Sequence, residues 1–180
     1  MRWKTKLQLL FVALIGIGAS GCLKVQSVSN IPAIEFKSWD WVVLDTTASV
    51  TISFTDGDGD VGGGTVMDSA APYNVQAPPY YDFIMLYYYQ DPKDGKFKRY
   101  YSPQSKDSTL VYEHISNLTP AGPDKSLHGE INFMMSGPFG PPSISGSGKP
   151  MYPIFRYDIF IYDRAGHKSN IVSTPVMQIP

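Results

Sequence analysis

The sequence contains a single cysteine, Cys22, among its 180 residues. Because a second thiol is missing, no disulfide can form within the chain, and its stability depends on packing or on a bound metal. An excess of one charge is missing as well, since 15 basic and 16 acidic residues leave a net charge of -1. A chain with this balance has no general electrostatic attraction for nucleic acid, so we expect no nucleic-acid partner.

The usual catalytic signatures are also absent from the sequence. None of the three histidines stands in an HExxH arrangement, and no GxSxG nucleophile turn occurs. The stretch Gly146-Ser147-Gly148-Lys149 partly matches a phosphate-binding loop, but Ser143 replaces its first glycine and Pro150 replaces the hydroxyl residue that holds Mg²⁺. We therefore expect a protein that is not an enzyme.

A short apolar run occupies residues 7–18, near the N-terminus. It follows a basic start that contains Arg2, Lys4 and Lys6. A transmembrane helix needs about 20 apolar residues, and this run is shorter. A basic start, a short apolar run and small residues after it are typical of a secretory signal peptide. We therefore predict a signal peptide at residues 1–21.

Cys22 directly follows the small residues Ala19, Ser20 and Gly21. This segment resembles a bacterial lipoprotein signal of the lipobox type, although Ala19 stands where leucine is commoner. The resemblance implies that the Cys22 thiol receives a diacylglycerol group, with fatty acids such as palmitate, before cleavage exposes the amine. Leu23 is not the acidic residue linked with retention in the inner membrane, which favours the outer membrane. A plain cleaved signal followed by an unmodified cysteine is the alternative.

Helical patterning is missing after residue 22, whereas alternation with a period of two recurs. Between residues 49 and 55, Val50, Ile52 and Phe54 alternate with polar residues, which is typical of a half-buried antiparallel strand. The 12 tyrosines and 9 phenylalanines also favour strands. The expected strands cover residues 34–41, 49–55, 80–90, 97–101, 109–115, 127–135, 152–162 and 169–179. About seven strands at this spacing predict an all-β antiparallel β-sandwich, with a closed barrel as the alternative.

The chain divides into three predicted parts. The signal peptide at residues 1–21 precedes a polar, lipidated tether at residues 22–32, and one sandwich domain fills residues 33–180. Two long loops rich in glycine and proline, at residues 56–79 and 136–150, interrupt the strands. Loops longer than about 15 residues are uncommon unless they are functional or disordered.

The sharpest motif alternates Asp56, Asp58 and Asp60 with two glycines. Three converging carboxylates repel one another unless a cation lies among them, and a set of hard oxygen donors favours Ca²⁺. It is not an EF-hand, because Val61 stands where that loop needs glycine. Asp163 is the best additional ligand, since the two loops that carry these residues lie at one end of a sandwich. An acidic turn without an ion and a site for another metal are the alternatives.

Two stretches of the sequence carry a resemblance to a known group of proteins. Residues 54–62 and residues 162–170 are similar to segments of uncharacterised bacterial lipoproteins with an immunoglobulin-like domain. The second stretch also resembles the last hairpin of extracytoplasmic Ig-like and cadherin-like modules, although His167 replaces the usual asparagine. The resemblance implies an Ig-like sandwich with an adhesive, scaffolding or ligand-binding role.

We therefore expect a lipid-anchored protein of the bacterial cell envelope that acts as a non-enzymatic binding or scaffolding module. Its structural cofactor would be Ca²⁺, and its partners would be the membrane and an unidentified protein or glycan. The alternative is a glycan-binding or glycan-processing accessory lipoprotein, associated with a hydrolase. Catalytic carboxylates would then stand about 5–10 Å apart, and clustered tyrosines would present rings for sugar stacking.

Overall fold

The computed structural model describes residues 28–43, 47–63, 81–101, 109–136 and 152–178. The predicted signal peptide, Cys22, most of the tether and most of the two long loops lie outside these residues. The described part of the chain forms nine strands and no α-helix. It contains no helix that is long and apolar enough to cross a bilayer. The strands form two antiparallel sheets, as the alternation in the sequence predicts.

The first sheet has three strands, and its central strand pairs with one strand on each side. Its strands, in the order β1-β2-β6, are β1 (Ala33–Val43), β2 (Thr47–Asp56) and β6 (Leu127–Ser136). The central strand buries Val50, Ile52 and Phe54, while Thr55 on its other face is exposed. This is the predicted alternation, and it gives the sheet one face toward the core and one toward solvent.

The second sheet has six strands and is built around β3 and β7. Its members are β3 (Phe83–Gln90), β4 (Phe97–Arg99), β5 (Thr109–Glu113), β7 (Ile154–Ile161), β8 (Val172–Ser173) and β9 (Met177–Gln178). Strand β3 pairs with β4, β5 and β7. It buries Met85 on one face and Ile84 and Leu86 on the other, so this strand is covered on both sides.

The last predicted strand, at residues 169–179, is divided into β8 and β9 in the structure. The division occurs at Thr174, whose hydroxyl accepts a hydrogen bond from the Tyr157 backbone N–H at 2.9 Å. The backbone N–H of Thr174 donates to the Tyr157 carbonyl. Pro175 follows and has no N–H to continue the ladder. The Thr174 hydroxyl therefore accepts one hydrogen bond from β7 at the point where the last strand is interrupted.

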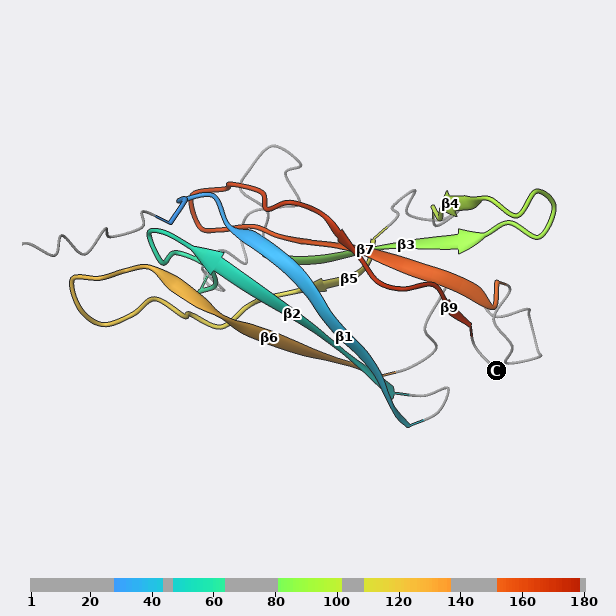
Figure 1. Ribbon diagram of the computed structural model, residues 1–180, viewed down its shortest axis with the longest axis horizontal. Helices are drawn as coiled ribbons and strands as arrows, with labels where there is room; N and C mark the ends of the chain where they lie inside the picture. The colour runs from blue at the N-terminus through green and yellow to red at the C-terminus, as the bar shows by residue number, and fades with distance from the viewer. Residues whose placement is uncertain (1–27, 44–46, 64–80, 102–108, 137–151, 179–180) are drawn as a thin grey trace, which may run out of the picture.

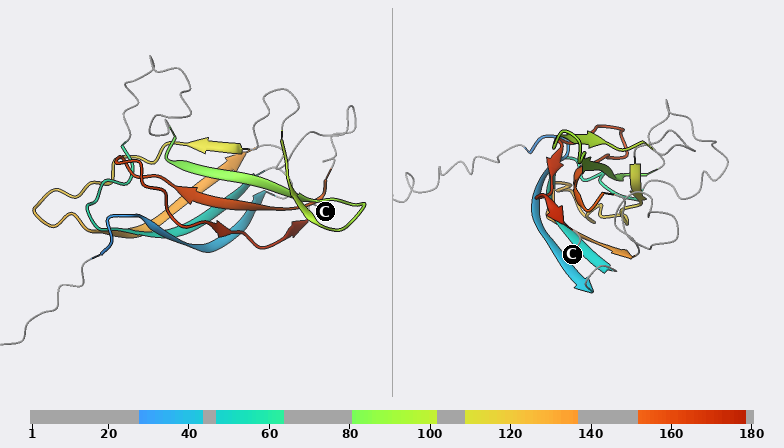
Figure 2. Two further views of the ribbon diagram at one scale, coloured as in Figure 1. Left: turned by 90° about the horizontal axis from the view of Figure 1, so that it is seen from above. Right: turned by 90° about the vertical axis from the view of Figure 1, so that its right-hand side faces the viewer.

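The two sheets lie one over the other (Figure 2). The core between them is rich in aromatic side chains. The Trp39 ring from β1 stacks on Tyr157 from β7, with 5.6 Å between the ring centroids. Tyr87 and Phe155 stack at 5.5 Å, and both are fully buried. The two sheets thus pack face to face as a β-sandwich. Of the clustered tyrosines, Tyr87 is a buried core residue, and Tyr89 and Tyr100 pack against the core while partly exposed.

One end of the sandwich gathers segments that are far apart in the sequence (Figure 1). The chain enters the domain there through residues 28–31, which we call the entry segment. Strand β2 finishes at the same end, and so do the turn after β7 and the connection from β5 to β6. The hairpin between β3 and β4 lies at the opposite end. The predicted metal motif therefore sits beside the point where the chain enters.

Candidate metal centre

The candidate centre is carried by residues 56–63, which we call the aspartate loop. The loop starts at Asp56, the last residue of β2, and its residue Val61 forms an antiparallel bridge with Asp163. The φ angle of Gly59 is 70°, a conformation that glycine adopts without a steric penalty. The loop therefore turns sharply between its second and third aspartates.

The structure brings Asp56, Asp58 and Asp60 together. Each offers a carboxylate oxygen, and these three atoms lie within 4.8 Å of one another. The Oδ1 atoms of all three residues are buried and have no hydrogen-bond partner. Asp56 itself is completely buried, with 0% of its surface exposed. Buried polar atoms nearly always have a partner, so these three oxygens are the residues' candidate ligand atoms for a cation.

The Oδ2 atoms of Asp56 and Asp60 are held by backbone amides. Asp56 Oδ2 accepts a hydrogen bond from the Asp60 N–H at 2.9 Å. Asp60 Oδ2 accepts one from the Ala165 N–H at 3.0 Å. These bonds fix two of the side chains, so the loop is ordered around its carboxylates.

Burial and mutual repulsion act on the loop carboxylates. Burial raises the pKa of Asp56, and the charges of Asp58 and Asp163 raise it further. Burial also raises the pKa of Asp60, with added repulsion from Asp163, Asp58 and Asp56. The arrangement is thus costly for negative charge, as expected where like charges crowd together.

Asp163 lies next to the loop but is not a member of the group of three. Its Oδ1 accepts a hydrogen bond from the His167 N–H at 2.7 Å, and its Oδ2 lies 2.8 Å from His167 Nδ1. This contact raises the pKa of His167. Asp163 therefore contributes negative charge beside the loop, while its oxygens hold the turn after β7. The sequence predicts Asp163 as an additional ligand of the ion, and that role stays a prediction.

Neighbouring backbone approaches the loop closely at Gly57 and Gly59. The Gly57 N–H donates to the Ser29 carbonyl at 2.8 Å, and a Cβ at Gly57 would overlap the Val28 carbonyl oxygen. A Cβ at Gly59 would overlap the Lys125 carbonyl oxygen. Gly57 and Gly59 thus leave room for the neighbouring backbone, while the three aspartates that alternate with them bring their oxygens together.

Arg164 ties the aspartate loop to the connection between β5 and β6, a role that the sequence analysis missed. Its Nη1 donates to the Gly62 carbonyl and its Nη2 to the Thr119 hydroxyl, both at 2.7 Å. Thr119 in turn donates to the Gly59 carbonyl at 2.8 Å. The guanidinium therefore braces the loop backbone. An arginine directly after Asp163 gave no local signal for this long-range contact.

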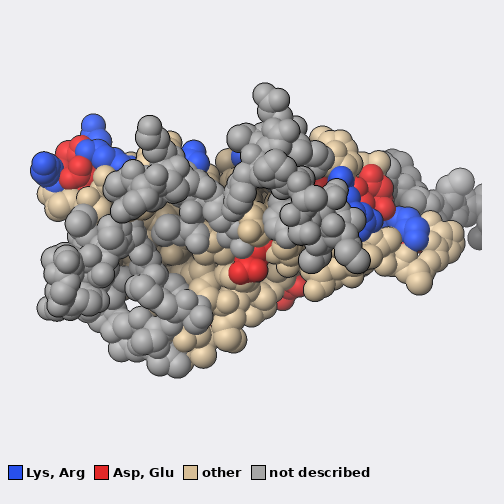
Figure 3. Space-filling view, turned by 180° about the vertical axis from the view of Figure 1, so that it is seen from behind, with Lys and Arg blue, Asp and Glu red and all other residues tan. Residues whose placement is uncertain are grey.

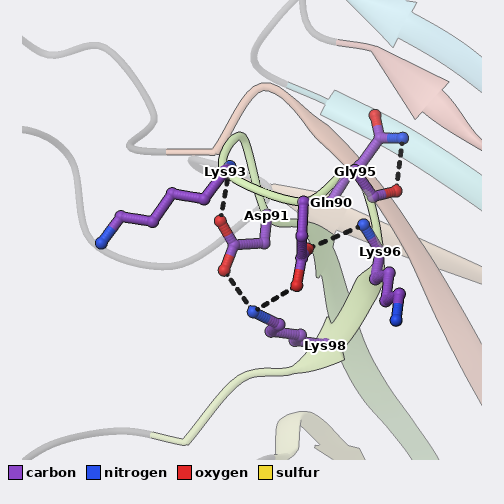
Figure 4. Close-up of polar contacts among 7 residues, drawn as sticks. Gln90, Asp91, Lys93, Gly95, Lys96 and Lys98 are labelled. Carbon is purple, nitrogen blue, oxygen red and sulfur yellow. Dashed lines mark hydrogen bonds and ion pairs between the residues drawn. The ribbon is translucent and has the colours of Figure 1, made fainter.

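A second charged region lies in the hairpin between β3 and β4, at the opposite end of the molecule (Figures 3 and 4). Its two aspartates form ion pairs and hydrogen bonds with residues of the same hairpin. Lys98 pairs with both Asp91 and Asp94. The same aspartates accept hydrogen bonds from the backbone N–H groups of Lys93 and Lys96. Most residues of this turn are exposed to solvent. Its carboxylates therefore stabilise a turn and share a cation, Lys98, that the hairpin itself supplies.

Comparisons with protein-family models, with curated proteins and with solved structures found no match to this chain.

Proposed function

We propose that this protein is a lipid-anchored component of the bacterial cell envelope whose Ig-like β-sandwich acts as a non-enzymatic binding or scaffolding module. In this proposal Ca²⁺ stabilises the domain through Asp56, Asp58 and Asp60. The observation that carries the proposal is the group of three buried, unpartnered carboxylate oxygens within 4.8 Å of one another.

The charges of the aspartate loop support a cation. Among the described residues, no lysine, arginine or histidine forms an ion pair with Asp56, Asp58 or Asp60. A buried carboxylate without a partner is costly, by about 1–3 kcal/mol or more for each group. A divalent ion among the three oxygens would turn their repulsion into attraction. Ca²⁺ fits best, because it takes about 6–8 oxygen ligands in flexible geometry and accepts backbone carbonyls and water beside carboxylates.

The same geometry favours binding over catalysis. Paired carboxylates that act as acid and base on a glycosidic bond stand about 5–9.5 Å apart, with room for substrate or water between them. The oxygens of the aspartate loop instead crowd around one point, and the loop backbone closes over them. Tyr87 and Tyr157 are buried in the core, which leaves less support for a glycan-stacking surface.

The two stretches that resemble Ig-like lipoproteins lie against each other in the fold. The bridge between Val61 and Asp163 joins residues 54–62 to residues 162–170. Both stretches belong to the end of the sandwich where the chain enters. This arrangement supports the proposal that the resemblance concerns one structural unit, namely the end of an Ig-like domain.

The proposed anchor places this end close to the membrane. Six residue steps separate Cys22 from Val28. At about 3.3–3.6 Å per residue, an extended chain of that length spans roughly 20 Å. A lipid on Cys22 would therefore hold the aspartate loop near the head groups. The hairpin between β3 and β4, at the other end, would be presented to partners in the envelope.

Isothermal titration of calcium into the full mature chain, purified in detergent and stripped with chelator, tests the proposed site. We expect one calcium ion per chain and weaker binding of magnesium, whose small octahedral shell suits the loop poorly. Asp58→Asn should weaken calcium binding at least tenfold, because it removes a charge from the centre of the loop. Glu130→Gln, an exposed acid on β6, is the matched control and should bind calcium normally. Absence of calcium binding by the unaltered chain would contradict the proposed site.

A further inference from the structure

We propose that the aspartate loop is also the docking surface for the entry segment, and that calcium binding and docking of this segment strengthen each other. The inference rests on the proposed calcium site and concerns what that site controls. The partner is a stretch of the same chain, residues 28–31, which leads back to Cys22.

The contacts of the entry segment converge on one residue of the loop. The Gly57 N–H donates to the Ser29 carbonyl at 2.8 Å. A Cβ placed on Gly57 would lie 2.8 Å from that same oxygen and 2.9 Å from Asn30 Oδ1, and it would overlap the Val28 carbonyl. Gly57 stands between Asp56 and Asp58, so the segment rests directly on the backbone that positions two of the three carboxylates.

Among the residues that the structure describes, the Gly57 N–H is the one group outside the entry segment that forms a hydrogen bond with it. Val28 is 38% exposed and Ile31 is 54% exposed, so neither is packed in the core. The Ile31 N–H donates only to Ser29 Oγ, within the segment itself. Firm attachment begins further along the chain, at the buried Pro32 and at Ile34. Docking of residues 28–31 therefore depends on the position of Gly57.

The position of Gly57 depends in turn on the carboxylates beside it. When the loop curls so that the oxygens of Asp56 and Asp58 meet, the Gly57 N–H points at Ser29. Repulsion between the carboxylates opposes this curl, and a cation removes the repulsion. A cation that favours the curled loop therefore favours docking, and a docked segment raises the affinity for the cation by the same factor, because coupling between two sites is reciprocal.

The consequence concerns the distance between the domain and its proposed lipid. With calcium bound, the docked part of the chain begins at residue 28. Without calcium, residues 28–31 are released and add about 13 Å of reach, at roughly 3.3 Å per residue. The release stops there, because Asn170 holds Ile34 through two hydrogen bonds that do not involve the loop. Calcium would thus draw the domain toward the membrane surface.

Hydrogen exchange resolved to single amides, on the full mature chain in detergent, tests the coupling directly. With calcium in place of chelator, we expect the amides of Gly57 and Ile31 to exchange at least fivefold more slowly. The Ile34 amide, bound to Asn170, and the Gly95 amide of the distant hairpin are internal controls that should change little. If calorimetry shows calcium binding while the Ile31 amide exchanges at an unchanged rate, the coupling is wrong and the calcium site stands.

A glycine substitution tests the reverse direction. Gly57→Ala keeps all three aspartates but places a methyl group where the entry segment lies, so it should raise the Kd for calcium at least fivefold. Gly129→Ala on β6 is the matched control, since its Cβ would meet the Phe54 ring at an ordinary 3.4 Å, and it should bind calcium normally. Unchanged calcium affinity in a folded Gly57→Ala chain would overturn the proposal. If that variant does not fold, the exchange rates of the unaltered chain decide. Absence of calcium binding by the unaltered chain would remove the proposed function and this inference together.

Discussion

Asn170 holds both backbone polar groups of Ile34, a residue 136 positions earlier in the chain. Its Oδ1 accepts a hydrogen bond from the Ile34 N–H, and its Nδ2 donates to the Ile34 carbonyl, both at 2.8 Å. Ile34 lies at the start of β1 in the three-stranded sheet, whereas Asn170 follows β7 of the six-stranded sheet. One amide side chain therefore joins the two sheets where the chain enters the domain.

We predict that Asn170→Ala lowers the free energy of unfolding by about 1–3 kcal/mol, since two partly buried backbone groups lose their partner. Urea denaturation of the two proteins measures the difference. Asn132→Ala is the control, because Asn132 donates to the Thr51 hydroxyl on an exposed face, and its loss should cost less than about 1 kcal/mol. Equal losses for the two variants would show that the link between the sheets has no special role.

Asp82 is a second buried carboxylate, outside the aspartate loop. Its Oδ1 accepts a hydrogen bond from the Ile115 N–H at 2.6 Å, while its Oδ2 is buried without a partner. Burial raises the pKa of Asp82, and the hydrogen bond from Ile115 and the nearby charge of His114 oppose this only in part. The folded-state pKa therefore lies above the unfolded value, so this group favours folding at low pH and loses that contribution as the pH rises through its folded pKa.

We predict that Asp82→Asn is more stable than the unaltered protein at pH 7, and that this difference disappears toward pH 4. The asparagine keeps an oxygen that accepts from Ile115 but carries no charge that burial can penalise. Urea denaturation of both proteins at several pH values, with calcium held constant, measures the difference. A difference that stays constant over this range would mean that Asp82 does not titrate as its burial implies.

Cys22→Ser should abolish lipidation, because only the thiol can accept the diacylglycerol group. We predict that cells fed an alkyne fatty acid label the unaltered protein but not the variant. Membrane fractionation should then find the unaltered protein with the membranes and the variant released from them. Label that persists on the Cys22→Ser chain would contradict the proposed anchor.

Local patterns predicted most of the fold. The alternation of Val50, Ile52 and Phe54 predicted β2, and the spacing of three aspartates predicted that their carboxylates meet. The nearness of Asp163 also followed from strand order, since the loops after β2 and β7 lie at one end. These features depend on neighbours in the sequence or on the order of strands in a sandwich.

What the sequence did not reveal depends on contacts between distant residues. Asn170 and Arg164 look like ordinary polar turn residues, and their partners lie 136 and 102 positions away. Thr174 interrupts the last strand through a hydroxyl that bonds Tyr157 on β7. The contact between Asp163 and His167 is different, because these residues are only four positions apart. That spacing could have indicated from the sequence that the Asp163 carboxylate contacts the His167 ring.

Thermal unfolding shows whether calcium stabilises the fold through the aspartate loop. An ion that binds only the folded state adds about 2.7 kcal/mol at a hundredfold excess over its Kd. For a domain of this size that corresponds to a rise in Tm of roughly 5–10 °C. We predict this rise with calcium, its reversal by chelator and its loss in Asp58→Asn but not in Glu130→Gln. Melting curves that superimpose with saturating calcium and with chelator would contradict the account and leave the loop as an acidic turn.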